Sequence, residues 1–171
     1  DSTDPVITLI GANPMTVELG GTYSEPGATS DGGETVTITG TVNTATVGEY
    51  TITYSATDAN GNIGTATRTV NVADSTDPVI TLIGANPMTV ELGGTYSESG
   101  ATSDGEETVT ITGTVNTATV GTYTITYSAT DANDNTGTAT RTVNVVDSTD
   151  PVITLIGANP MTVELGGTYS E

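Results

Sequence analysis

Hydrophobic and polar residues alternate with a period of two along most of this chain. Residues 49–58 (EYTITYSATD) place tyrosine, isoleucine or alanine at every second position, with threonine or serine between them. Since successive side chains of a β-strand point to opposite faces, this pattern predicts a half-buried strand. Residues 5–11, 15–20, 34–42 and 64–72 are also expected to form strands, and no segment has the apolar repeat typical of a helix. The residues expected to point inward in the two clearest strands are Val36, Ile38, Tyr50, Ile52, Tyr54 and Ala56.

This set of five predicted strands occurs more than once. Residues 1–73 recur as residues 74–146, and residues 147–171 begin a third copy. Six of the 73 paired positions differ: Pro26/Ser99, Gly33/Glu106, Glu49/Thr122, Gly61/Asp134, Ile63/Thr136 and Ala73/Val146. We therefore expect repeat 1 at residues 1–73, repeat 2 at 74–146, and the first two strands of an incomplete repeat 3 at 147–171. The chain is expected to be a window on a longer array.

The strand count also predicts how the units connect. We call the end of a unit near its first residue the leading end, and the opposite end the trailing end. If five strands run alternately up and down, the turn at residues 13–14 and the loop at 43–48 lie at the trailing end, and the loops at 21–33 and 59–63 lie at the leading end. An odd number of strands separates the two termini of a unit, and a further short pair of strands within residues 21–33 would keep the number odd. The units are therefore expected to stack end to end.

The charge of the chain restricts its partners. It carries 21 carboxylates against two basic residues, Arg68 and Arg141, and its formal net charge is −19. Such a charge opposes direct contact with nucleic acid or an anionic membrane and favours cations. An enzyme is not expected, because the chain has no histidine, cysteine or lysine and its near-identical repeats supply no unique site.

The acids gather at the predicted leading end of each unit, where neighbouring units meet. Crowded carboxylates without lysine or histidine favour a hard divalent cation, and calcium takes about six to eight oxygen ligands. The linker DSTDP, the loop at residues 30–32 and the turn at 58–62 could supply these oxygens, as could their copies. The predicted calcium ligands are Asp1, Asp4, Asp31, Asp58, Asn60, Asn62, Asp74, Asp77, Asp104, Asp131, Asn133, Asn135, Asp147 and Asp150.

The turn at residues 58–62 presents side-chain oxygens at the spacing i, i+2, i+4 that opens many calcium loops. It is not an EF-hand, because its glycine comes one position late and no helices flank it. The same residues have a simpler explanation, since aspartate, asparagine and glycine are good turn formers without any metal. Both interpretations remain open at the level of the sequence.

Three other features have structural explanations. Alternation places Arg68 on the inward face of its strand, so it could pair with an acid at a sheet edge, or a bulge could turn it outward. We expect it at an exposed sheet edge, where a charge prevents unwanted pairing. Glu18 and Glu91 are expected to be solvated strand positions. The threonines at residues 35–41 could form a face that binds glycan or ice, although β-propensity alone explains them.

The runs DPVITLIGANPMTVELGGTYSEPGATSDG and VGEYTITYSATDANGNIGTATRTVNV resemble the immunoglobulin-like repeats of bacterial surface proteins and adhesins. The resemblance covers the whole chain and implies tandem antiparallel immunoglobulin-like β-sandwiches that are displayed at a cell surface. The strand with Tyr50 and Tyr54 is similar to the penultimate strand of immunoglobulin sandwiches, in which a phenol caps a neighbouring loop.

Repetition, acidity and this resemblance together predict a structural protein, secreted or at the cell surface. It would be a calcium-rigidified stalk of an adhesin or a segment of a matrix filament. Its expected partners are the neighbouring repeats, copies of itself in a filament, and a host or surface glycan bound through a tip outside this chain. The alternative is a glycan- or ice-binding module that uses the threonine-rich strand faces.

Overall fold

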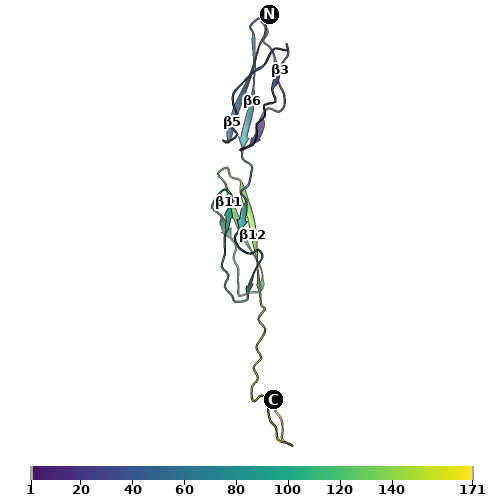
Figure 1. The fold of residues 1–171 in the computed structure, drawn as a ribbon, viewed down its shortest axis with the longest axis vertical. Coiled ribbons are helices and arrows are strands. Elements are labelled where there is room, and N and C mark those ends of the chain that lie inside the picture. Colours follow the sequence, from purple (N-terminus) through teal and green to yellow (C-terminus); the bar gives the residue numbers. More distant parts are fainter. Residues whose placement is uncertain (1, 171) are drawn as a thin grey trace.

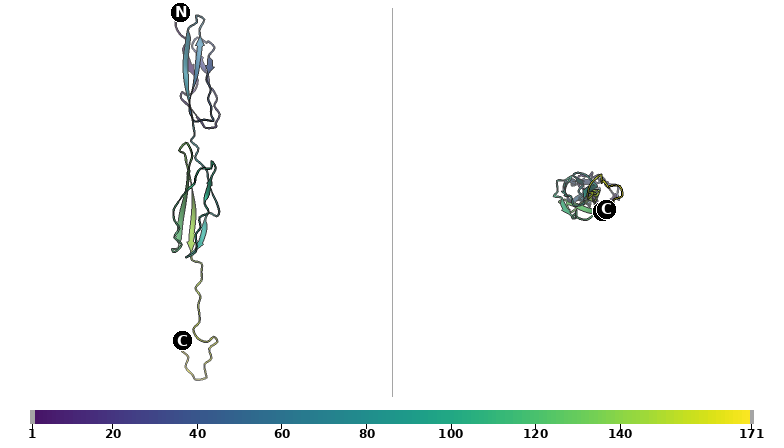
Figure 2. Two further views of the ribbon diagram at one scale, coloured as in Figure 1. Left: turned by 90° about the vertical axis from the view of Figure 1, so that its left-hand side faces the viewer. Right: turned by 90° about the horizontal axis from the view of Figure 1, so that it is seen from below.

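The computed structural model describes residues 2–170. Asp1, one of the predicted calcium ligands, and Glu171, the last residue of the expected third repeat, lie outside the described residues. Two all-β units follow one another end to end, and an extended segment leads away from the second (Figures 1 and 2). The predicted all-β class with tandem sandwiches is therefore confirmed. Residues 2–170 contain no helix that is long and apolar enough to cross a membrane.

Each unit is built from two facing sheets. In unit 1, β1 (Ile7–Leu9) pairs with β3 (Ala28–Ser30), and the second sheet has the order β2 (Met15–Glu18), β6 (Ile63–Ala73), β5 (Gly48–Thr57) and β4 (Thr37–Thr39). In unit 2, β7 (Ile80–Leu82) pairs with β9 (Ala101–Ser103), and the second sheet has the order β8 (Met88–Glu91), β12 (Thr136–Val146), β11 (Gly121–Thr130) and β10 (Thr110–Thr112). The two units thus have the same topology.

The turn at residues 13–14 does not reverse the chain, so the prediction that the first two strands run in opposite directions was wrong. The N–H of Val6, just before β1, donates to Asp31 at the leading end, whereas Glu18 at the end of β2 pairs with Ala73 at the trailing end. The chain therefore keeps its direction through Asn13 and switches from one sheet to the other, and β2 pairs parallel with β6. Since β1 and β2 make one pass, the chain crosses the unit an odd number of times, and its termini lie at opposite ends as expected.

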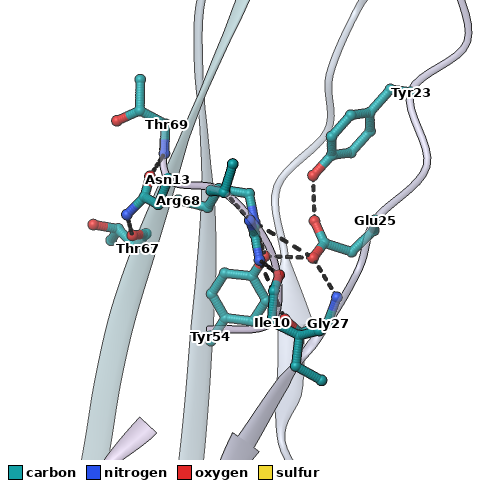
Figure 3. A network of polar contacts seen from close by, with 10 residues as sticks. Ile10, Asn13, Tyr23, Glu25, Gly27, Tyr54, Thr67, Arg68 and Thr69 are labelled. Carbon is teal, nitrogen blue, oxygen red and sulfur yellow. Dashed lines mark hydrogen bonds and ion pairs between the residues drawn. The ribbon is translucent and has the colours of Figure 1, made fainter. Parts of the chain in front are cut away.

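Asn13 supports this change of sheet. Its side-chain carbonyl accepts a hydrogen bond from the N–H of Thr69 at 2.9 Å, and its amide donates to the carbonyl of Thr67 at 3.0 Å. The side chain thereby occupies the edge of β6 just before Met15 begins the regular pairing (Figure 3). Proline follows Asn13 and has no N–H to offer that edge, so a side chain replaces the missing backbone partner.

The core lies between the sheets and follows the predicted alternation. Ile52, Tyr54 and Ala56 of β5 are buried, together with Val70 and Val72 of β6. The prediction was wrong for Ile38, whose side chain is 43% exposed, because β4 is the edge strand of its sheet. Tyr50 is half-buried, and its hydroxyl donates to the carbonyl of Thr46 at 2.9 Å, so it caps the preceding loop as the resemblance implied.

Arg68 is fully buried, which corrects its predicted place at an exposed edge. No bulge turns it outward, since β6 keeps a regular register with Ile52 opposite Arg68. Its guanidinium donates to the carbonyls of Ile10 (2.6 Å), Ala12 and Gly27 (3.2 Å), and thus ties β6 to the end of β1 and to the segment before β3 (Figure 3). Arg141 makes the equivalent bonds in unit 2.

A carboxylate and two phenols complete this buried network. The Nε of Arg68 donates to the hydroxyl of Tyr54 at 2.7 Å and lies 3.7 Å from Glu25, and Tyr54 and Tyr23 both donate to the carboxylate of Glu25 (Figure 3). Glu25 therefore lies against the core and not at the leading end, where the loop pattern had placed it. The burial of Glu25 opposes its ionisation, but the hydrogen bonds from both tyrosines, the N–H of Gly27 and the charge of Arg68 outweigh it, and the pKa of Glu25 is lowered.

Residues 148–170 form no strand, although two strands were expected in the third copy. Val152, Ile156 and Leu165 are 91%, 101% and 106% exposed. In the complete units, the same sequence forms strands only by pairing with β3 and β6 or with β9 and β12. Two isolated strands bury too little apolar surface to be stable in water.

Candidate functional site

The leading end of each unit holds a shallow acidic pocket. In unit 1, its volume is about 240 Å³, and it is lined by Thr3, Asp4, Pro5, Asp31, Gly32, Glu34 and Asp58. In unit 2, its volume is about 250 Å³, and it is lined by Asp74, Thr76, Asp77, Pro78, Asp104, Gly105, Glu107 and Asp131. The fold thus brings together most of the aspartates predicted as calcium ligands, and it adds Glu34 and Glu107, which the sequence analysis did not single out.

Backbone geometry explains why these acids converge. Asp31 follows β3 directly, and its carboxylate accepts hydrogen bonds from the N–H groups of Val6 (2.9 Å) and Gly32 (3.0 Å). This aspartate joins the linker to the loop after β3. The carboxylate of Glu34 folds back over the same loop and accepts from the hydroxyl of Ser30. Asp104 and Glu107 make the equivalent bonds to Val79 and Ser103 in unit 2.

The turn at residues 58–62 is closed by its own aspartate. The carboxylate of Asp58 accepts hydrogen bonds from the N–H groups of Asn60 and Asn62 and from the side-chain amide of Asn62, each at 2.8 Å. The side-chain bond from Asn62 makes the largest contribution to a lowered pKa of Asp58. Asp131 is held in the same way by Asn133 and Asn135, and its pKa is also lowered, chiefly by the side chain of Asn135.

These contacts bear on the two interpretations of the acids. The pockets offer only oxygen ligands, which suits calcium chemically. Within residues 2–170, however, no three acidic side chains are arranged to hold a metal ion between them. The bonds of Asp31 and Asp58 are those of turn-forming residues, so the simpler interpretation explains the geometry as it stands.

Among residues 2–170, six of the predicted ligands do not line the pockets. Asn60, Asn62, Asn133 and Asn135 lie just behind them, where they hydrogen-bond to the pocket aspartates. Asp147 and Asp150 are exposed in the third copy, where no unit surrounds them.

Glu18 binds the linker between the units, which sequence reasoning missed. Its carboxylate accepts hydrogen bonds from the N–H of Ser75 (2.8 Å), the hydroxyl of Ser75 (2.8 Å) and the hydroxyl of Thr76 (2.9 Å). The N–H of Ser75 makes the largest contribution to a lowered pKa of Glu18. No local sequence pattern indicated this contact, because it depends on the parallel register of β2 against β6, which brings Glu18 beside Ala73 at the start of the linker.

Asp74 connects the same linker to the following unit. Its carboxylate accepts a hydrogen bond from the side-chain amide of Asn133 at 2.8 Å, and its backbone carbonyl accepts from the side-chain amide of Asn135 at 3.2 Å. It also accepts from the N–H of Thr76 at 3.2 Å. The linker is therefore held from both sides by direct protein contacts.

Comparison with known proteins identifies related sequences. A family model described as "Bacterial surface protein, Ig-like domain" matches residues 7–72 and 80–145. The chain is 34% identical over 191 residues to hyalin from Lytechinus variegatus, an alignment that covers 98% of this chain and 36% of that protein. It is also 34% identical over 93 residues to hyalin from Strongylocentrotus purpuratus, covering 48% of this chain and 8% of that one. The chain thus spans about a third or less of the length of these relatives.

Two solved structures show weaker likeness. A lipoprotein from Bacteroides thetaiotaomicron is 18% identical with a TM-score of 0.37, over 81% of this chain and 79% of that one. The extracellular domain of protocadherin GammaB4 is 12% identical with a TM-score of 0.31, over 84% and 33% of the two chains. Both TM-scores are low, so neither likeness is informative about function.

Proposed function

The chain belongs to the family of bacterial surface proteins with an Ig-like domain, and from this membership we propose that its tandem units form part of a stalk or fibre outside the cell. The observation that carries the proposal is the linker, which is hydrogen-bonded to the unit before it and to the unit after it. Units joined in this way extend a chain in one direction (Figure 2). The function is mechanical, since each unit adds length and the linker limits bending.

The partners of such a stalk follow from its repetition. Each unit contacts its neighbours in the same chain, and copies of the chain assemble in a filament. A glycan on a host or another surface is bound by a tip outside this chain. The likeness to hyalin is compatible with an adhesive or structural role, although this chain spans only 36% of the length of the first of these relatives.

Calcium is the proposed stiffening ion. In the pocket of unit 2, Asp77, Asp104, Glu107 and Asp131 would supply carboxylate oxygens once their side chains turned toward the ion, and bound calcium would neutralise their mutual repulsion. The pocket includes Asp74 and Thr76 of the linker, so an ion there would strengthen the attachment of the linker to unit 2. The support for this proposal is the convergence of four or more acids in a protein without lysine or histidine.

A calcium titration followed by calorimetry tests this part of the proposal. At free calcium a hundredfold above the dissociation constant, one site adds about 2.7 kcal/mol to the free energy of unfolding. The double variant Asp4→Asn, Asp77→Asn removes one carboxylate from each pocket and is expected to show a smaller increase in melting temperature. Glu49→Gln, which removes one carboxylate outside both pockets, is the control for loss of charge alone. Equal melting temperatures in chelator and in millimolar calcium would contradict a role for calcium.

Small-angle scattering tests the stalk itself. The variant Asp74→Ala, Asp77→Ala removes the linker carboxylates and the bond from Asn133, and leaves the cores of both units unchanged. Its maximum dimension in calcium is expected to be shorter than that of the original chain. An unchanged maximum dimension would show that these aspartates do not stiffen the junction.

Glycan or ice binding through the threonine-rich faces remains the alternative. A binding module would retain affinity in a single unit, residues 74–146, whereas a spacer would show none and would gain length with unit number. Titration of that single unit with glycans, and an ice-growth assay, distinguish the two functions.

A further inference from the structure

The hydrogen bonds of the linker cross over. Ser75 and Thr76, which are nearer to unit 2 in sequence, bind Glu18 of unit 1. Asp74, which is nearer to unit 1, binds Asn133 of unit 2. A linker whose bonds cross in this way cannot be straightened by pulling the units apart unless both sets of bonds break.

At the linker that follows unit 2, the contact with the preceding unit can be seen by itself, because no folded unit follows within residues 150–170. Glu91 of unit 2 accepts hydrogen bonds from the N–H and hydroxyl of Ser148 (2.8 and 2.6 Å) and from the hydroxyl of Thr149 (2.9 Å). No strand forms in residues 150–170 that follow. The bonds of the glutamate therefore form without a folded unit downstream. This observation distinguishes the glutamate contact from a by-product of packing between two units.

We propose that Glu18 and Glu91 are the residues that lock each linker to the unit before it, and that this lock orients the following unit without any metal ion. This proposal rests on the proposed stalk function, and it names the contacts that hold the stalk straight when no metal ion is bound. Glu18 is the last residue of β2 and pairs with Ala73, the last residue of β6, and Glu91 pairs in the same way with Val146. Each glutamate therefore lies directly beside the point where the linker begins. Serine and threonine at the second and third linker positions supply the donors.

A sequence difference between the units supports a specific role for Glu18 and Glu91. Unit 1 has Glu49 and unit 2 has Thr122 at the equivalent position, and the linker bonds are the same in both. Glu49 lies on β5 opposite Asn71, near the same end of unit 1, and is exposed. It is therefore an acid of equal charge near the junction that does not take part in the lock.

Distance measurements between spin labels test the lock. The chain has no cysteine, so Thr65→Cys and Thr138→Cys, both at exposed and equivalent positions, label unit 1 and unit 2 specifically. With chelator present, the labelled chain is expected to give a narrow distance distribution. Adding Glu18→Ala is expected to abolish the narrow peak, Glu18→Gln to broaden it, and Glu49→Gln to leave it unchanged. Calorimetry of the same variants checks that both units stay folded.

The outcomes separate the lock from the proposed function. A Glu18→Ala distribution as narrow as that of the labelled parent would overturn the lock. A parent distribution that is broad in chelator and narrow in calcium would also overturn it, while calcium stiffening would stand. A parent that is broad under both conditions would overturn the lock and the stalk together. A narrow parent that broadens with Glu18→Ala in chelator supports the lock, whatever calcium does.

Discussion

Arg68 shows how one charged residue organises a small core that has no phenylalanine, tryptophan or disulfide. Its guanidinium holds three backbone carbonyls from segments that regular pairing does not connect to β6. Arginine suits this place because its planar group offers five donors in fixed directions. The cost of burying the charge is offset by Glu25, by the hydroxyl of Tyr54 and by these carbonyls.

Replacing this arginine is expected to unfold one unit selectively. Arg68→Met removes the cation beside Glu25 and the guanidinium donors to the carbonyls of Ile10 and Ala12. Removing one partner of a buried ion pair costs roughly 3–5 kcal/mol, and a value toward the lower end is expected because the Glu25 side chain is 23% exposed. Thermal unfolding is expected to show an early transition for unit 1, while unit 2, with Arg141 intact, serves as the control within the same molecule. A single unchanged transition would contradict this role.

The carboxylate of the same network predicts a dependence of stability on pH. The pKa of Glu25 is lower in the folded unit than in the unfolded chain. Its stabilising contribution is therefore complete above the unfolded value of about 4.3 and is lost as the pH falls through the folded pKa. The double variant Glu25→Gln, Glu98→Gln is expected to lose less stability than the original chain between about pH 5 and pH 2, because it lacks the two carboxylates whose protonation destabilises the folded units over roughly that range. Melting temperatures of both chains across this range measure the difference. Equal losses would show that other carboxylates dominate.

At the scale of the strand, alternation predicted β5 and β6 well, and it also located β1 and β2, but not the way in which those two strands are connected. Long strands with one buried face have a strong period of two, so Ile52, Tyr54 and Val70 could be assigned from sequence. The change of sheet at Asn13 could not, because its cause is a hydrogen bond to a strand more than fifty residues away. Glu18 was misjudged for the same reason, since its partners lie in the linker. The gathering of acids at the leading end could be expected from sequence, because most of them lie in the loops and turns that join predicted strands.

Close contact between β6 and the segment before β1 explains Gly64. A Cβ atom at this position would lie 1.8 Å from the carbonyl oxygen of Pro5, a distance that no side chain could occupy. Gly64→Ala is therefore expected to displace the segment before β1 and to lower the melting temperature of unit 1. Thr65→Ala, at the adjacent exposed position, is the control. A melting temperature as high as that of the control would show that the backbone can move away without cost.

For the whole molecule, the unequal structure of its three copies predicts unequal protection. Hydrogen exchange should be slow in β5, β6, β11 and β12, whose amides are paired within four-stranded sheets. It should be fast in residues 151–170, which form no strand, although the same sequence at residues 5–24 is expected to be protected where it pairs. The peptide of residues 5–24 has the same sequence, and so the same mass, as residues 78–97 and 151–170. Exchange measured by mass spectrometry is therefore expected to show two populations of this one peptide, a slow one from units 1 and 2 and a fast one from the third copy. A single slowly exchanging population would contradict the structure.

The burial of both arginines also determines how whole molecules meet each other. With Arg68 and Arg141 at 0% exposure and no lysine or histidine, every charged side chain on the surface of this protein is an acid. Two such rods lying side by side have no cationic group to offer each other, so they repel over about the Debye length, roughly 8 Å at physiological salt. Close lateral alignment then requires multivalent cations or a basic partner between the rods. Because both guanidinium groups are buried, the array can grow along its axis, whereas neighbouring arrays repel each other side by side.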